Sequence, residues 1–359
     1  MKLTRIFCLI LSWSALTSCQ PERTTTDALP VLQAAEQLTF LDAFRVVRFT
    51  ELGEEGGMGG VNRLEVGKQH LYVLDEESSR ALHVYTETGA FSHSIRGFEG
   101  GNLYDFVVDE EAGFLYLFTP GRKIEQFTLD GTFVQSVRIS FGFEKLLFAE
   151  GETLWLYAGY DTEREYLLVQ VAAGTGEVLQ ERLPKPEEPL LDFLPQQFSG
   201  RLPGGGFFFH LPLSDMFYLF TADGELIQTV TFDFEGRLAT SFEDLAQENL
   251  PEHLITHADA FLLVGDQLLF YFSEAGVPAY RMLDIKRLSF QELRPQDKSV
   301  DDFILSFACL QPMASKGNTF YSVMDVDYIR LFLSESEGSQ FEGLMDSDAL
   351  FVVLEMELK

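Results

Sequence analysis

The stretch LYVLDEESSRALHVYTETGAFSHSI, residues 71–95, decides the fold class. Three apolar runs alternate with two polar turns, and the second turn contains Thr88-Gly89. This order is typical of short antiparallel strands joined by hairpins, because glycine supplies the backbone angles that a tight turn requires. LYLFTPGRKIEQFTLDGTFVQSVRI, residues 115–139, has the same order, which indicates a repeated unit rather than an isolated hairpin.

Further copies of the unit follow along the chain. Clear copies begin at Leu154 and Phe207, and more divergent copies begin at Leu268 and Phe320. Successive copies start 39–61 residues apart, near or above the roughly 40–50 residues of a propeller blade. The sequence therefore predicts an all-β fold, a six-bladed β-propeller. No Trp-Asp pair occurs, which argues against a WD-repeat propeller.

A further short apolar run precedes most copies and completes a four-stranded blade. RLEV, YDFVVD, KLLFAE and AFLLVGD stand in this position, and we expect them to form innermost strands. The last blade lacks one strand after residues 349–358, whereas residues 41–52 hold one strand too many before the first blade. Because an open sheet edge promotes aggregation, we predict that residues 44–51 supply the outer strand of blade six and close the ring.

The N-terminus has the order of an export signal. Basic residues precede an apolar run from Ile6 to Leu16, which is shorter than the roughly 20 residues of a membrane-spanning helix. Leu16-Thr17-Ser18-Cys19 resembles the lipobox of bacterial lipoproteins; the alternative is an ordinary signal peptide with an incidental cysteine. The resemblance implies a signal peptide over residues 1–18, lipidation of Cys19 and attachment to a membrane through that lipid.

The segment after this cysteine suggests a linker. Residues 19–36 are rich in Pro, Thr and charges and suit a flexible tether, which leaves residues 37–359 for the propeller. By analogy with lipoproteins, Gln20 rather than Asp after the cysteine favours the outer membrane. We therefore expect an exported protein, anchored by lipid in the cell envelope.

Charge and cysteine content limit the molecules that the chain can bind and the disulfides that it can form. The chain has 26 basic and 56 acidic residues, a formal net charge of −30, so nucleic acid is a poor partner. Once Cys8 leaves with the signal and Cys19 is acylated, Cys309 has no partner for a disulfide. Its apolar surroundings in ILSFACLQP indicate a buried, unreactive thiol.

The first complete repeat also carries a family resemblance. Asp75, Arg80, Tyr85 and Gly89 match the order of the NHL repeat: a strand ending in Asp, a turn with Arg, an aromatic strand and a Gly turn. Together with the lipobox and six blades, the chain resembles the TolB-like propeller lipoproteins of Bacteroidota. The resemblance implies structural roles for Asp75 and Arg80 in the blade turns.

Motifs for chemistry are mostly missing. The sequence has no Gly-x-Ser-x-Gly elbow and no phosphate-binding loop. His253 and His257 lie four residues apart, but Leu254 stands where a zinc peptidase has its Glu. The triplets at 325–327 and 346–348 contain paired Asp residues without the Gly and Glu of a calcium loop. We expect no cofactor, with calcium as the one metal left open.

Two insertions interrupt the repeats and should lie over a face of the propeller. Residues 183–198 are Pro-rich, and residues 237–258 contain SFEDLAQENL, which predicts a short helix capped by Ser241. A ligand site should lie in the central channel, where the inner strands of six blades converge. Polar residues at the expected strand starts are the rim candidates for binding: Arg63, Asp105, Lys145 and Arg201.

Two classes of function fit these observations. The first is a non-catalytic binding or scaffold module for a protein, peptide or glycan, with no catalytic residues, and we favour it because catalytic motifs are missing. The second is a metal-dependent hydrolase or lyase with its site in the channel. That class requires several acidic side chains to converge there, for which Asp109, Glu144 and Asp302 are further candidates.

Overall fold

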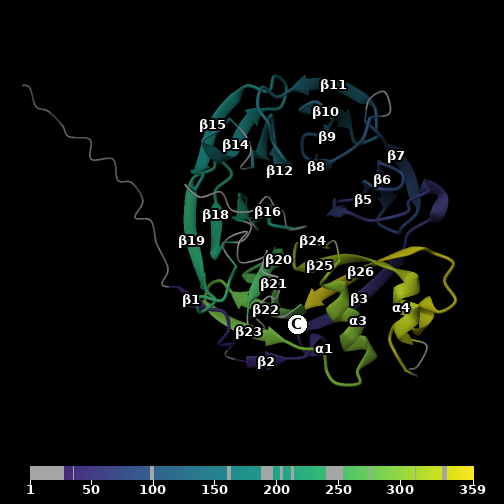
Figure 1. Cartoon of the computed structure of the whole chain (residues 1–359). Coiled ribbons are helices and arrows are strands. Elements are labelled where there is room, and N and C mark those ends of the chain that lie inside the picture. Colours follow the sequence, from purple (N-terminus) through teal and green to yellow (C-terminus); the bar gives the residue numbers. More distant parts are fainter. Residues whose placement is uncertain are drawn as a thin grey trace, which may run out of the picture.

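Six antiparallel sheets stand around a central axis in a computed structural model of the chain (Figure 1). The structure describes residues 28–34, 36–97, 101–159, 163–186, 197–202, 205–211, 214–239, 254–274, 276–311, 313–333 and 338–359. Each sheet contains four antiparallel strands, which are consecutive in the chain in five of the six sheets, and two sheets carry a fifth strand. The prediction of an all-β, six-bladed propeller is confirmed.

Blades one to three each use one complete copy of the repeat, from the inner to the outer strand. The predicted inner strands RLEV, YDFVVD and KLLFAE correspond to β4, β8 and β12. Blade one comprises β4 (Arg63–Val66), β5 (His70–Asp75), β6 (Ala81–Thr86) and β7 (Phe91–Ile95). Blade two comprises β8 (Asp105–Asp109), β9 (Phe114–Thr119), β10 (Lys123–Thr128) and β11 (Phe133–Arg138). Blade three comprises β12 (Lys145–Glu150), β13 (Thr153–Tyr157), β14 (Tyr166–Ala172) and β15 (Val178–Pro184).

Two of the residues matched to the NHL repeat, Asp75 and Arg80, lie at the connection between β5 and β6. Asp75 is fully buried, and its carboxylate accepts hydrogen bonds from the backbone N–H groups of Gly59, Ser78 and Ser79. These bonds tie the β5–β6 turn to the chain segment that precedes blade one. Arg80 has a positive φ of 53° in the same turn. In this turn, the Asp of the pattern is thus buried and stabilises the turn through hydrogen bonds to backbone N–H groups.

Blades four and five carry the additional fifth strands at their outer edges. Blade four comprises β16 (Ser199–Arg201), β17 (Phe207–His210), β18 (Met216–Phe220) and β19 (Leu226–Asp233), with β1 (Leu29–Pro30) parallel to β19. Blade five comprises β20 (Ile255–Val264), β21 (Gln267–Glu274), β22 (Val277–Asp284) and β23 (Ser289–Leu293), with β2 (Glu36–Leu38) parallel to β23.

Residues 28–34 therefore pack against the propeller, whereas the sequence predicted a free tether there. Val31 is fully buried, and its carbonyl accepts a hydrogen bond of 2.9 Å from Nε of Arg281. Apolar side chains at Leu29 and Val31 pack into the core between blades four and five. Burial of these side chains and edge pairing fix the backbone. Residues 1–27, with the expected signal peptide and Cys19, lie outside the described residues.

Blade six is completed by the N-terminal strand, as predicted. It comprises β24 (Met313–Lys316), β25 (Thr319–Asp325), β26 (Phe351–Leu358) and β3 (Phe44–Glu51), in that order from the axis outward. β3 and β26 pair antiparallel, from Phe44 opposite Leu358 to Glu51 opposite Val352. The Lys359 N–H also donates to the carbonyl of Ala43 at 2.9 Å. The two ends of the propeller are thus joined within one sheet.

Helices surround blade six. The structure shows α1 (Phe40–Ala43), α3 (Val300–Ala308) and α4 (Val326–Leu333), with 3-10 turns at Glu54–Gly56 and Glu342–Leu344 (Figure 1). In the divergent copy that begins at Phe320, strand β25 is therefore followed directly by helix α4, where the repeat pattern predicts a second strand. Ser299 caps α3 by accepting from the N–H of Asp302 at 3.2 Å. The helix expected after Ser241 lies outside the described residues.

The core consists of aromatic and aliphatic side chains between neighbouring blades. In the contact of blades three and four, Trp155 is fully buried and its ring centroid lies 5.2 Å from that of Phe207.

Cys309 is a free, buried cysteine, and burial raises the pKa of its thiol to about 12. No helix among the described residues has both the length and the apolar character needed to span a membrane.

Candidate functional site

The inner strands surround a cavity of about 570 Å³ along the propeller axis. This volume lies within the ~300–1,000 Å³ of ordinary ligand pockets. All six blades contribute lining residues, including Leu262 from β20 and Met313 from β24. The charged lining residues within the described ranges come only from blades one to four. The channel thus has a charged side and an uncharged side.

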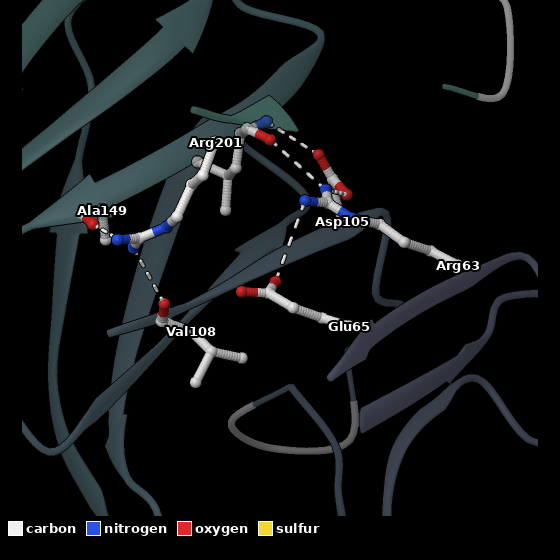
Figure 2. Close-up of polar contacts among 7 residues, drawn as sticks. Arg63, Glu65, Asp105, Val108, Ala149 and Arg201 are labelled. Atoms are coloured by element: carbon white, nitrogen blue, oxygen red, sulfur yellow. Dashed lines mark hydrogen bonds and ion pairs between the residues drawn. The ribbon is translucent and has the colours of Figure 1, made fainter. Parts of the chain in front are cut away.

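An ion pair fastens three blades together at the end of the channel where the inner strands begin. Asp105 is fully buried, and its carboxylate pairs with the guanidinium of Arg63 from blade one. Asp105 also accepts a 2.7 Å hydrogen bond from the N–H of Leu146 in blade three, and Arg63 donates to the Leu146 carbonyl at 3.3 Å (Figure 2). Burial alone would lower the pKa of Arg63, but Asp105 and Glu65 outweigh it and raise that pKa.

Glu65 lies two residues further along β4 and also lines the channel. Its Oε2 lies 4.0 Å from Nη2 of Arg63, too far for a hydrogen bond (Figure 2). Among the described residues, no donor reaches this buried oxygen. Burial raises the pKa of Glu65, opposed by the positive charges of Arg63 and Arg201. Glu65 is therefore a partly desolvated acid that interacts with Arg63 and the Val108 backbone but keeps one carboxylate oxygen without a hydrogen bond from the described residues.

The side chain of Arg201 extends from blade four to blades two and three. Its Nη2 donates to the carbonyl of Ala149 at 2.5 Å and to the carbonyl of Val108 at 3.3 Å (Figure 2). The guanidinium also lies 5.9 Å from the ring centroid of Phe148. These contacts hold the side chain across blades two and three. The residue remains exposed to the channel.

Lys145, the first residue of β12, and Glu76, which follows β5, both line the channel. Burial raises the pKa of the Glu76 carboxyl, while the positive charge of Lys145 acts in the opposite direction. No ion pair joins the two, and the ammonium of Lys145 has no hydrogen-bond partner within the described part of the chain. Both side chains are half-buried.

The four residues selected from the sequence all line this channel: Arg63, Asp105, Lys145 and Arg201. Arg63 and Asp105 bind one another and blade three, whereas Lys145 keeps its charged group unengaged by described residues. Sequence reasoning missed Glu65 and Glu76. Alternation along a strand could have found Glu65, because residues two apart face the same side.

The additional acidic candidates do not converge with these residues. Asp109 lines the channel, but Asp302 lies outside it, where it accepts a 2.7 Å hydrogen bond from the N–H of Leu41. Glu144 is not among the lining residues. Within the described ranges, no three His, Cys, Asp or Glu side chains form a group that could hold a metal ion. His253 and the side chain of His257 lie outside the described residues.

Two solved structures share this architecture. A Bacteroides fragilis protein, whose provisional name is that of an exported protein, superposes with a TM-score of 0.69 at 16% identity, over 93% of this chain and 98% of that one. A member of the DUF4221 family from Bacteroides vulgatus superposes with a TM-score of 0.51 at 10% identity, over 89% of this chain and 99% of that one. Identities this low show the fold alone. No curated protein matches the sequence.

The sequence also matches the model of a protein family. The DUF5128 family, described as a 6-bladed β-propeller, matches residues 21–260. This range includes blades one to four and the β3 strand that closes the ring. Because the match covers well over half of the chain, the protein belongs to the DUF5128 family of six-bladed β-propellers.

Proposed function

We propose that this protein is a non-catalytic binding module of the cell envelope, which receives a protein, peptide or glycan ligand in its central channel. The observation that carries the proposal is a set of charged groups that face the channel and whose hydrogen-bonding capacity the described residues leave partly unused. A channel wall that served only to join blades would satisfy its buried polar groups, as protein interiors generally do. Glu65, Lys145 and the exposed edge of Arg201 instead retain capacity for a ligand.

We further propose that the chain is exported and held in the outer membrane by lipid on Cys19. The lipobox-like sequence at 16–19 and the name of the Bacteroides fragilis neighbour support this localisation. On this view the TolB-like and NHL-like resemblance reflects shared ancestry with propeller lipoproteins. The tether expected over residues 19–36 would then end before Leu29, because Leu29–Pro30 pairs with β19.

Site-specific photo-cross-linking tests the binding role. A photoreactive amino acid at Ser199, which lines the channel, is compared with the same amino acid at Leu179, which is 49% exposed on the outer strand β15. In intact envelopes we expect a discrete cross-linked adduct from position 199 only. Adducts of equal yield from both positions, or only from position 179, would exclude the channel as the binding site.

Metabolic labelling tests the anchor separately. The wild-type chain should incorporate labelled palmitate and sediment with membranes, and Cys19→Ser should do neither. A Cys8→Ser variant is the matched control, because Cys8 lies in the expected signal peptide. Membrane association of Cys19→Ser at the wild-type level would contradict lipid anchoring, whatever the result for the channel.

A further inference from the structure

Two helices beside blade six, α3 and α4, contact one another through aromatic side chains (Figure 1). The ring centroids of Phe303 in α3 and Phe332 in α4 lie 4.9 Å apart, in an edge-to-face contact. The ring centroid of Phe307 lies 5.4 Å from that of Tyr328 and 6.0 Å from that of Phe332. The four rings thus form one aromatic cluster that spans both helices.

Helix α4 is apolar on two opposite sides. Three of its residues are buried in the core of blade six: Val326, Ile329 and Leu333. Successive residues of an α-helix are rotated by about 100°, so Tyr328, Leu331 and Phe332 lie on the side away from that core. Tyr328 is 52% exposed and Leu331 is 66% exposed. A surface helix normally places polar residues on this side, so the core of blade six does not explain the sequence of α4.

Helix α3 extends the exposed apolar surface. Its Ile304 and Leu305 are buried, whereas Phe303 is 46% exposed and contacts α4 through the aromatic cluster. The helical patch is the name used below for the following five residues: Phe303, Phe307, Tyr328, Leu331 and Phe332. Single exposed apolar residues are common on proteins, but contiguous ones mark interaction sites, and aromatic residues are enriched at protein–protein interfaces.

The charges around the helical patch indicate what binds there. Helix α4 and residues 338–350, which pack against it, contain four acidic residues, all exposed: Asp327, Glu342, Asp346 and Asp348. Their one basic residue, Arg330, is already engaged, because its Nη1 donates to Asp327 at 2.9 Å and its Nε to the Leu344 carbonyl at 3.3 Å. Aromatic rings also attract cations over their faces. Lys or Arg side chains beside apolar ones would complement both features.

Two other occupants would bring negative charge to this acidic surface. A second copy of the chain has the same formal net charge of −30, and an anionic membrane is repelled for the same reason. We infer that the helical patch binds a basic amphipathic helix of another protein, with the apolar side of that helix against α3 and α4. The five residues of the patch are not among those that line the channel, so this surface is distinct from the proposed channel site.

Isothermal titration calorimetry with synthetic peptides tests the binding. The probe is a helical peptide of Leu and Lys whose leucines lie on one side. One control has the same composition in an order that gives no apolar side, and a second has the apolar side with Glu in place of Lys. We expect saturable binding of the probe, and binding weaker by about tenfold or more, or about 1.4 kcal/mol, for both controls.

Leu331→Ser and Val277→Ser form a matched pair of variants. Leu331 and Val277, the first residue of β22 in blade five, are 66% and 65% exposed. Leu331→Ser should weaken binding of the probe by about tenfold, as expected for an apolar contact at the centre of an interface, and Val277→Ser should leave it within about twofold. Because both side chains are exposed, the melting temperatures should match that of the wild type, which excludes misfolding as the cause.

Several results would overturn the inference. Equal binding of the peptide without an apolar side, or equal binding by Leu331→Ser and the wild type, would show attraction by net charge alone. Preference for the Glu peptide would contradict the charge complementarity. Flotation with phosphatidylcholine–phosphatidylglycerol vesicles, or a dimer in analytical ultracentrifugation, would assign the patch to a membrane or a second copy if Leu331→Ser abolished it. Cross-linking at Ser199 is independent of all these results and judges the channel separately.

Discussion

The closing strand offers a stringent test of the fold, through the substitution Phe44→Ala. Phe44 is the first residue of β3 and is only 1% exposed. Its ring meets that of Phe320 in an edge-to-face contact at 5.7 Å, and the ring of Phe40 lies 6.3 Å away. The side chain therefore links the N-terminal strand to the core of blade six. Truncation to Ala removes this link and leaves the backbone pairing in place.

The expected loss of stability follows from the buried area. An aromatic side chain buries about 200 Å², and at ~25 cal/mol/Å² its burial is worth about 5 kcal/mol as an upper estimate. Large-to-small substitutions of Phe in cores lower the free energy of unfolding by about 3–5 kcal/mol. We therefore expect a loss of about 4 kcal/mol. With an unfolding entropy of roughly 0.7 kcal/mol/K for a domain of this size, the melting temperature should fall by about 6 °C.

Urea unfolding and differential scanning calorimetry measure this loss, with Val47→Ala as the control on the same strand. Val47 is 48% exposed, so its truncation should change the free energy of unfolding by less than about 0.5 kcal/mol. If Phe44→Ala loses no more stability than Val47→Ala, then β3 does not hold the ring closed. The packing argument for closure would then be refuted.

Three further predictions concern single positions. Burial lowers the pKa of His210 to about 3, so the stability of the folded state should fall as the pH decreases from about 6.5 towards 3. Thermal melts should show a smaller decline for His210→Gln, and an unchanged dependence of the melting temperature on pH would contradict this prediction. Burial raises the pKa of the Cys309 thiol to about 12, so iodoacetamide at pH 8 should leave it unmodified in the native protein and modify it in urea, as measured by mass spectrometry. Rapid labelling of the native protein would disprove the burial. Gly224→Ala places a Cβ 2.3 Å from the Trp155 ring, whereas Gly113→Ala meets nothing within 4 Å at a similar positive φ. Chemical unfolding should therefore show Gly224→Ala to be less stable by about 1–3 kcal/mol, and equal losses would contradict the clash.

Most of the blade pattern was predictable because it depends on local signals. Alternating apolar residues, glycine turns and a recurring spacing define the strands of blades one to three without knowledge of their partners. The additional strands at residues 29–30 and 36–38 have no such signal. They are only two or three residues long, and their partners in β19 and β23 lie about two hundred residues or more away. Tertiary pairing, rather than local propensity, determines them.

Helix α3 was missed for a different reason. The apolar run in residues 300–308 is short, and such a run does not distinguish a buried helix from a buried strand. The capping signal was nevertheless present, because Ser299 stands three residues before Asp302 and accepts from its N–H. The divergent sequence of blade six thus reflects helices inserted into the repeat.

The candidate site was predictable in position but not in detail. Inner strands must line the axis of a propeller, so residues at their starts had to lie near the channel. Which side chains bind one another could not be predicted, because contacts such as Arg63 with Asp105 join different blades. Glu76 follows a second strand, β5, and reaches the channel only through the turn geometry.

The pairing of β3 with β26 has a consequence for biosynthesis. Arg48 and Glu355, which meet across this seam, are 307 residues apart in the chain. β3 leaves the ribosome before any blade, yet its partner is synthesised only after five blades and most of the sixth. Contacts this distant in sequence form slowly, and until then the early strand keeps an unprotected edge. A prematurely terminated chain that lacks the eight residues of β26 would retain that edge permanently and become a target for proteases.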